Sequence, residues 1–308
     1  MVQIRKIAIC GRKADPLWTG RLTLLFKAIA RHNIKVCWQD TFKSVMVRLF
    51  AWEEDPSVLP KGETFTSHSD FPEDVDLMLT LGGDGTFLSS LTYLRGRRVP
   101  VAGINFGRLG FLTSSVVREN DDNLWMDKLL EGDFLTEQRP LLEVECNDMP
   151  KSVCPYALNE VTVQRSTPNM LGVTLKVDSV PLPTYWADGL VISTPTGSTA
   201  YNLSLGGPII LPGSDILSVA PIAPHNLNVR PLIIPAGSEL ELGIEAKKNS
   251  ADFTIDNRQF KVSNSSVIKV KKSSFHVSCA FLSDSGFLCA LQEKLFWGED
   301  RRNIQGNY

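Results

Sequence analysis

The sequence lacks the features of membrane-spanning, secreted and disulfide-linked proteins. No apolar run approaches the roughly 20 residues that cross a bilayer, and the apolar stretch at residues 1–10 is too short for a secretion signal. The six cysteines include no C-x-x-C pair, and the four histidines lie far apart. Neither a disulfide framework nor a metal cage is therefore predicted, and we expect a cytoplasmic protein with free thiols and no metal ligands of its own.

An excess of charge of one sign is also missing. Lys and Arg together number 32 and Asp and Glu number 34, which gives a net charge of −2, and the chain has no basic block. This balance predicts that neither nucleic acid nor an anionic membrane is a partner. With 308 residues, 43% of them hydrophobic, the chain is long enough for two domains and a large core.

Strand-like and helix-like runs alternate from residue 4 to about 115. Strands are expected at 6–10, 34–38, 75–81 and 99–104, and helices at 17–31, 42–50 and 86–94. This alternation predicts an α/β domain in which a parallel sheet carries helices on both faces. Residues 51–73 show no periodicity and are expected to form a surface loop.

After a helical stretch at 124–130, the pattern changes to short strands. They are expected at 141–146, 158–164, 171–177, 190–193, 232–234, 240–244, 253–255, 267–270 and 275–281. Their spacing predicts an all-β, sandwich-like domain. Residues 287–296 return to helical periodicity, and we expect this tail to pack on the first domain. The predicted domains are thus 1–118 with about 283–308, and 119–282.

A glycine-rich turn, Gly82-Gly83-Asp84-Gly85-Thr86, separates a buried strand from a helix in this prediction. Such a turn forms an anion site, because backbone N–H groups converge there with the positive end of the helix dipole. Gly82, Gly83, Gly85 and Thr86 are predicted to form the phosphate loop. A carboxylate would repel phosphate, so we interpret Asp84 as the group that takes the proton from the attacking hydroxyl. No lysine follows the turn, which excludes a P-loop ATPase.

A second polar motif runs from Asp188 to Pro208 and includes the hydroxyl-rich segment from Thr194 to Tyr201. Its hydroxyls and backbone amides can hold phosphate or sugar oxygens, and Tyr201 can stack on a base. The alternative is a Ser/Thr-rich turn that caps a helix at Thr199. A third candidate is the Asn159-Glu160 pair in a strand-like run, which is either solvated at an edge or aimed at a ligand.

Taken together, these motifs resemble the NAD kinase family, whose members transfer a phosphoryl group from ATP to the 2′-hydroxyl of the adenosine ribose of NAD. The resemblance covers almost the whole chain in the family's order. It includes Gly82–Thr86, residues 103–105 with 109–113, residues 158–160, Asp188–Pro208, residues 224–225 with 230–231, and residues 294–298. The glycine turn alone is shared with 6-phosphofructokinases and diacylglycerol kinases, and the Thr194–Tyr201 segment separates the families.

The resemblance implies a site and its ligands. Asp84 would be the general base on the ribose hydroxyl, with Gly85 beside the bound nucleotide. The further residues implied in binding NAD are Asn159, Glu160, Asp188, Thr199, Ala200, Tyr201, Asn202, Leu203 and Ser204. We expect Mg²⁺ to accompany ATP, and we expect a homo-oligomer, a dimer or a tetramer.

The chain also departs from the family's usual pattern. Trp186 stands where several members carry arginine, and Asp256-Asn257-Arg258 stands where Asp-Gly-Gln is common. Asn257 can adopt the left-handed conformation that a glycine would. Ligand contacts by Arg258, Asn169 and Arg108 are left open. Two alternatives to a NAD kinase remain: a non-catalytic pyridine-nucleotide sensor, against which the intact Asp84 argues, and a related sugar or lipid kinase.

Overall fold

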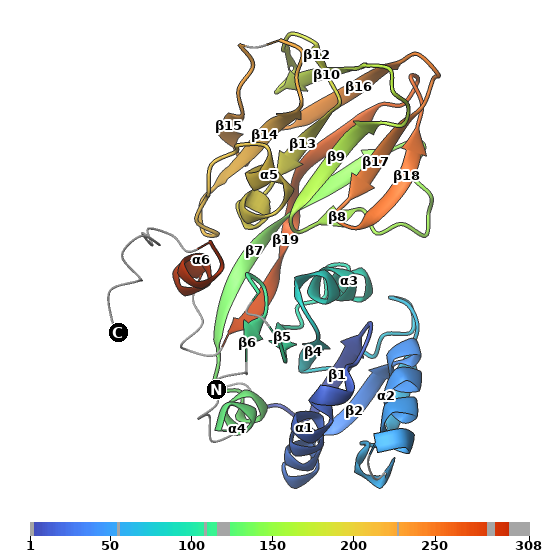
Figure 1. Ribbon diagram of the computed structural model, residues 1–308, viewed down its shortest axis with the longest axis vertical. Helices are drawn as coiled ribbons and strands as arrows, with labels where there is room; N and C mark the ends of the chain where they lie inside the picture. Colours follow the sequence, from blue (N-terminus) through green and yellow to red (C-terminus); the bar gives the residue numbers. More distant parts are fainter. Residues whose placement is uncertain are drawn as a thin grey trace, which may run out of the picture. The chain divides into compact units, whose positions relative to one another are not determined.

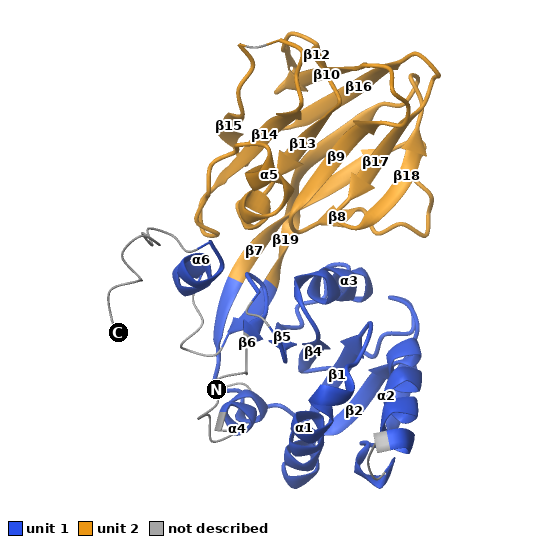
Figure 2. Ribbon diagram, in the orientation of Figure 1, with its two compact units in different colours: residues 1–137, 278–308 blue, residues 138–277 orange. Residues whose placement is uncertain are grey.

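The computed structural model describes residues 3–53, 56–107, 110–115, 124–226, 228–281 and 287–295. The chain forms two compact units, residues 1–137 with 278–308 and residues 138–277 (Figure 2). It passes between them within the strands β7 (Leu135–Cys146) and β19 (Ile268–Phe281). The predicted domain limits, near residues 118 and 282, remain predictions. None of the described helices combines the length and apolar character that a bilayer crossing requires.

Unit 1 is built on a parallel sheet with the strand order β5-β4-β1-β2-β3. Figure 1 labels β5, β4, β1 and β2 of this sheet. Its strands are β1 (Lys6–Gly11), β2 (Lys35–Gln39), β3 (Gly62–Phe65), β4 (Leu77–Leu81), β5 (Val101–Asn105) and the short β6 (Ser114–Ser115) beside β5. Every residue of β1 and β4 is buried, as expected for strands covered on both faces.

Helices cover both faces of this sheet. The helices of unit 1 are α1 (Thr19–Arg31), α2 (Asp40–Glu53), α3 (Asp84–Leu94), α4 (Leu124–Glu131) and α6 (Phe287–Leu295), with the 3-10 helices η1 (Pro16–Trp18) and η2 (Pro56–Val58). One core joins α1, α2 and α4 to Ala102 and Ile104 of β5. Gly103, between those two, faces the other way and lies against Phe87 of α3. The predicted α/β fold is confirmed.

The C-terminal helix belongs to unit 1. The ring of Phe287 in α6 lies with its centroid 5.7 Å from that of Phe111. The segment from 278 onward is part of the same compact unit as residues 1–137. This confirms the prediction that the tail packs on the first domain.

Unit 2 is a β-sandwich. One antiparallel layer has the order β15-β14-β13-β9-β17-β18, and the other contains β11, β10, β16 and β19 with β12 beside β10 and β7 beside β8. One core joins the inner faces of the two layers, for example Val163 of β9 and Val173 of β10. The predicted all-β fold of this part of the chain is therefore confirmed.

The remaining elements of unit 2 are short. They are β8 (Tyr156–Ala157), β9 (Glu160–Arg165), β10 (Leu171–Val177), β11 (Val180–Pro181), β12 (Tyr185–Ala187), β13 (Gly189–Ser193), η3 (Thr196–Thr199), α5 (Tyr201–Ser204), β14 (Ile216–Ile222), β15 (Leu232–Pro235), β16 (Leu240–Ala246), β17 (Ala251–Ile255) and β18 (Arg258–Val262).

The structure corrects the prediction in several regions. The strands expected at 267–270 and 275–281 form one strand, β19, and the strands β8, β11, β12 and β18 were not predicted. Residues 51–73 are not only a loop, because they contain η2 and β3, which pairs in parallel with β2. Only Phe65 of β3 is buried, so the strand carries no apolar pattern. Strand β14 was missed although it lies inside its layer, because Pro221 near its end argues against a central strand.

Candidate active site

The glycine turn joins β4 to α3 and leaves open space above it. Gly82 has a φ of +145°, and a Cβ there would lie 2.5 Å from the Thr86 hydroxyl oxygen, so this position requires glycine. Gly83 is the N-cap of α3 and offers no side chain to the N–H groups of the first turn. A Cβ on Gly85 would meet nothing within 4 Å. The turn therefore has the free space and the donors that an anion needs.

Asp84 is the first residue of α3, and residues 111–113 hold its carboxylate. The Phe111 N–H donates to Oδ2 at 2.9 Å, while the Leu112 N–H and the Thr113 hydroxyl donate to Oδ1 at 3.2 Å and 3.1 Å. A Cβ on Gly110 would lie 1.9 Å from Asp84 Oδ1, so only glycine allows this close approach. Three donors from one segment thus fix the orientation of the carboxylate.

Lys294 of α6 brings a cation to the same carboxylate. Its Nζ lies 3.5 Å from Asp84 Oδ2 and 4.7 Å from the centroid of the Phe111 ring. The side chains of Lys294 and Asp84 keep 30% and 28% of their exposure, so solvent reaches both. The motif at 294–298 marked this segment in the sequence, but nothing in the sequence indicated that its lysine would meet Asp84.

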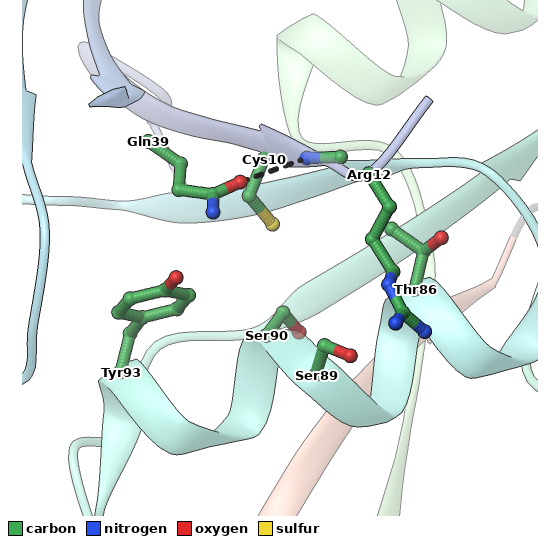
Figure 3. Close-up of a pocket in the computed structure, with 8 residues that line it drawn as sticks. Cys10, Arg12, Gln39, Thr86, Ser89, Ser90 and Tyr93 are labelled. Atoms are coloured by element: carbon green, nitrogen blue, oxygen red, sulfur yellow. Dashed lines mark hydrogen bonds between the residues drawn. The ribbon is translucent and has the colours of Figure 1, made fainter. Parts of the chain in front are cut away.

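A small hollow lies beside α3 (Figure 3). Its lining residues are Cys10, Gly11, Arg12, Gln39, Thr86, Ser89, Ser90 and Tyr93. The Gly11 N–H donates a hydrogen bond to the side-chain oxygen Oε1 of Gln39 at 3.4 Å. Hydroxyls, an amide and a guanidinium thus gather where the parallel strand β1 ends, a place at which open α/β sheets bind ligands. Sequence reasoning did not find this pocket; Thr86 belongs both to it and to the phosphate loop.

In unit 2, the Asn159-Glu160 step is held by a buried aspartate. The Asp256 carboxylate accepts hydrogen bonds from the N–H groups of Leu158, Asn159 and Glu160 at 2.9, 2.8 and 3.2 Å. The left-handed residue of this turn is Asp256, with a φ of 50°, and not Asn257. Aspartate tolerates that conformation, and here it brings the side chain back to the three N–H groups.

Glu160 has an unusual environment. Burial and, second, the charge of Asp256 raise the pKa of Glu160 to about 8, although the backbone N–H of Tyr201 opposes this. Its Oε2 is buried and has no hydrogen-bond partner among the described residues. A buried polar atom left without a partner is costly, so this oxygen is suited to face a ligand.

The predicted hydroxyl cradle is partly used inside the fold. Thr194 donates to the Leu158 carbonyl and Ser198 to the Ile210 carbonyl, and both hydroxyls are buried. The alternative of a helix cap at Thr199 is wrong, because Ala200 is the N-cap of α5 and Thr199 donates to the Thr196 carbonyl at 3.4 Å.

Close packing ties this segment to Asn159. A Cβ on Gly197 would lie 2.2 Å from the Asn159 carbonyl oxygen, so glycine is required there. The Glu160 carboxylate accepts a hydrogen bond from the Tyr201 N–H, and the Tyr201 hydroxyl accepts one from Gln164 at 3.0 Å. Unit 2 thus brings Asn159 and Glu160 together with the start of α5.

The predicted ligand residues of α5 differ in exposure. Asn202 is fully buried; its amide donates to the Ser198 and Pro208 carbonyls and accepts from the Ser218 hydroxyl. Residues Thr199, Ala200, Tyr201 and Leu203 are half-buried, and Ser204 is exposed. Asn202 therefore supports the segment from inside, while its neighbours keep accessible surface.

Asp188 forms a bidentate ion pair with Arg165 of β9. The Nε–Oδ1 and Nη2–Oδ2 distances are 2.8 Å and 3.0 Å. Sequence reasoning missed Arg165, because the pairing of β9 with β13 that brings it to Asp188 is a contact between distant residues.

The residues whose roles were left open lie in varied settings. Arg258 contacts Asp256 at 3.5 Å and the Tyr156 carbonyl, and Asn169 contacts Thr167 at 3.4 Å. Trp186 keeps 37% of its exposure. Arg108 lies outside the described residues.

Comparison with known proteins places these features in a family. The profile of the ATP-NAD kinase N-terminal domain matches residues 19–134, and that of the ATP-NAD kinase C-terminal domain matches residues 158–281. A NAD kinase of Flavobacterium psychrophilum is 35% identical over 301 residues, which are 97% of this chain and 100% of that protein.

Two solved structures have the same fold. Yeast NADH kinase complexed with NADH has a TM-score of 0.81 at 24% identity, over 98% of this chain and 91% of its own. A NAD kinase from Archaeoglobus fulgidus in complex with ATP has a TM-score of 0.66 at 26% identity, over 91% of this chain and 95% of its own. By its domain profiles and its full-length relatives, the chain belongs to the ATP-NAD kinase family.

Proposed function

We propose that this protein is a NAD kinase that transfers the γ-phosphoryl group of ATP to the 2′-hydroxyl of the adenosine ribose of NAD, which yields NADP and ADP. Membership of the family makes it a phosphotransferase that binds nucleotides. The observation that carries the proposal is the Asp84 carboxylate, held by three donors at the open glycine turn that begins α3.

Asp84 is proposed as the general base. The bond between the 2′-oxygen and the γ-phosphorus forms as the β–γ bridging bond breaks, and Asp84 takes the hydroxyl proton. Phosphoryl transfer has a loose transition state, so orientation of the hydroxyl and stabilisation of the phosphate charge matter more than nucleophile strength. The fixed carboxylate supports the first requirement, and the N–H groups at the start of α3 support the second.

NAD is proposed to contact residues of both motifs. They are Asp84, Gly85, Asn159, Glu160, Asp188, Thr199, Ala200, Tyr201, Leu203 and Ser204, with Asn202 acting as internal support. The strongest support is Glu160, whose buried Oε2 has no partner among the described residues and whose carboxyl group, with its raised pKa, can donate a hydrogen bond near neutral pH.

Mg²⁺ is proposed to enter with ATP as part of the substrate. Within the described ranges, no group of three or more His, Cys, Asp or Glu side chains is arranged to hold a metal ion. Mg²⁺ keeps water and phosphate ligands readily, and on ATP it would reduce the negative charge of the phosphates. A cytoplasmic location, supported by the composition, and a homo-oligomer, supported by the resemblance to the family, complete the proposal.

The direct test is NADP formation from NAD, ATP and Mg²⁺, measured with an NADP-specific cycling assay. We expect NADP to form, and we expect NAD analogues that lack the 2′-hydroxyl to yield no phosphorylated product. Binding of NAD without NADP formation, whichever divalent ion is present, would indicate a sensor. Phosphorylation of a sugar or a lipid but not of NAD would indicate a different kinase.

A further inference from the structure

We propose that Lys294 is the counter-charge of Asp84, a positioning residue that allows an anionic phosphate donor to bind beside a carboxylate. The inference rests on the proposed function, because only a phosphate-binding turn is disturbed by its own aspartate. Asp84 lies at the start of α3, next to the N–H groups that would hold phosphate. Its charge opposes the ligand that the turn attracts, and an adjacent cation offsets that repulsion.

Lys294 is held in place by packing. Its ammonium lies over the Phe111 ring at 4.7 Å, and the same Phe111 donates its N–H to Asp84 Oδ2. The Phe111 ring in turn contacts Phe287, at the beginning of α6. The helix, the aromatic pair and the carboxylate therefore form one connected cluster, and α6 places its cation at the turn.

The contact between Lys294 and Asp84 is accessible to solvent, as expected for a charged group that also acts on a substrate. Lys294 Nζ is 3.5 Å from Asp84 Oδ2, longer than an ordinary hydrogen bond, and both side chains keep close to a third of their exposure. An ammonium has three donors, and at this distance none of them is tightly bound to Asp84. A surface ion pair of this kind adds little stability, so electrostatics at the turn is the better account of its position.

The donor should be more sensitive to Lys294 than the acceptor. The triphosphate carries more negative charge than NAD, in which the nicotinamide cation offsets part of the diphosphate charge. In Lys294→Met we expect the KM for ATP to rise about 5- to 20-fold for a partly exposed charge. We expect the KM for NAD to change less, and Lys294→Arg to recover most of the ATP affinity.

The decisive experiment is a double-mutant cycle on ATP binding. Calorimetric titration of Mg-ATP without NAD compares the wild type, Lys294→Met, Asp84→Asn and the double variant. Because the asparagine is neutral, a counter-charge is no longer needed in the Asp84→Asn background. We expect Lys294→Met to weaken ATP binding when Asp84 is intact. The double variant should bind Mg-ATP within about twofold of the wild type, since both the repulsion from Asp84 and the charge that offsets it are gone.

Two controls separate the effect of Lys294 on ATP binding from a general loss of charge and from a loss of folding. Lys27→Met removes an exposed lysine of α1 in the same unit and should leave the affinity for ATP unchanged. Thermal unfolding of each variant reports any loosening of α6. A double variant that binds Mg-ATP as weakly as Lys294→Met, or no weakening in Lys294→Met itself, would overturn the inference. If either of these results is found and the wild type still forms NADP, the inference about Lys294 fails and the proposed function stands. The two failures can therefore be distinguished.

Discussion

Asp84 and Glu160 are both carboxylates proposed to meet NAD, yet their surroundings are opposite. Asp84 is partly exposed, accepts three hydrogen bonds and lies beside an ammonium group. Glu160 is largely buried beside a second carboxylate, and its Oε2 has no partner within the described part of the chain. Sites often separate two acids in this way, one equipped to accept a proton and the other kept neutral so that it can donate a hydrogen bond.

The largest difference between the two carboxylates is expected when each is replaced by its amide. We expect Asp84→Asn to lower kcat by about 10²- to 10⁴-fold, the usual contribution of a general base. Glu160→Gln should instead raise the KM for NAD and keep most of kcat, because an amide still donates a hydrogen bond. Steady-state assays of NADP formation measure both, with circular dichroism as the control for folding. Similar losses of kcat in the two variants would remove the distinction.

The pH dependence of stability should sharpen the contrast at Glu160. The folded protein holds this proton up to about pH 8, whereas the unfolded chain releases it near the ordinary pKa of 4.5. The folded state therefore binds more protons between these values, and the free energy of unfolding falls as pH rises. Between pH 5.5 and 7.5, the titration of Glu160 should lower the free energy of unfolding by about 2–3 kcal/mol.

Glu160→Gln removes that titration, so urea unfolding should show a shallower loss of stability in this variant than in the wild type. Glu245→Gln, which changes an exposed glutamate of the same unit, is the matched control. Identical pH slopes in the wild type and Glu160→Gln would mean that Glu160 is ionised in the folded protein.

Two glycine substitutions test the packing around the two proposed NAD-binding carboxylates, one next to Asp84 and one next to the Asn159-Glu160 step. Gly110→Ala places a Cβ 1.9 Å from Asp84 Oδ1, so residues 111–113 must shift. We expect kcat to fall about 10- to 100-fold, since small misplacements of a catalytic group are costly.

Gly197→Ala, whose Cβ would lie 2.2 Å from the Asn159 carbonyl oxygen, should mainly raise the KM for NAD. Gly20→Ala, in open space on α1, is the neutral control. If Gly110→Ala also changed only the KM for NAD, the segment at 111–113 would not orient a catalytic group.

The smallest effect is expected at Asp188. Its partner Arg165 and Asp188 itself keep 35% and 31% of their exposure, so Arg165→Met should cost at most about 1 kcal/mol of stability. If Arg165 orients Asp188 for NAD, the dissociation constant for NAD should rise modestly while kcat is kept. Calorimetric titration of NAD gives this value. An unchanged affinity for NAD would mean that the ion pair between Arg165 and Asp188 stabilises the fold and does not position Asp188 for NAD.

Local sequence patterns predicted what depends on neighbours along the chain. The strand, glycine turn and helix around Asp84 follow from apolar periodicity and from the conformation that Gly82 alone adopts easily. The same reasoning predicted α6 and most strands of unit 2. It missed β3 because a short strand with one buried side chain has no period to detect.

Contacts between distant residues could not be predicted in this way. Lys294 meets Asp84 across 210 positions, and Asp256 reaches the Asn159 N–H across 97. Both depend on how whole elements pack, which no local window contains. The hydroxyls of Thr194 and Ser198 are a similar case. The local sequence predicted them as ligand groups, but in the fold they are buried and donate to backbone carbonyl oxygens.

The central claim is that Asp84 acts in the chemical step. The rate of NADP formation in a single turnover, with enzyme and Mg-ATP in excess over NAD, isolates that step from substrate binding and product release. The account predicts that Asp84→Asn slows this rate by at least about 100-fold, while the dissociation constant for NAD changes less than about threefold. A single-turnover rate close to that of the wild type would contradict the account.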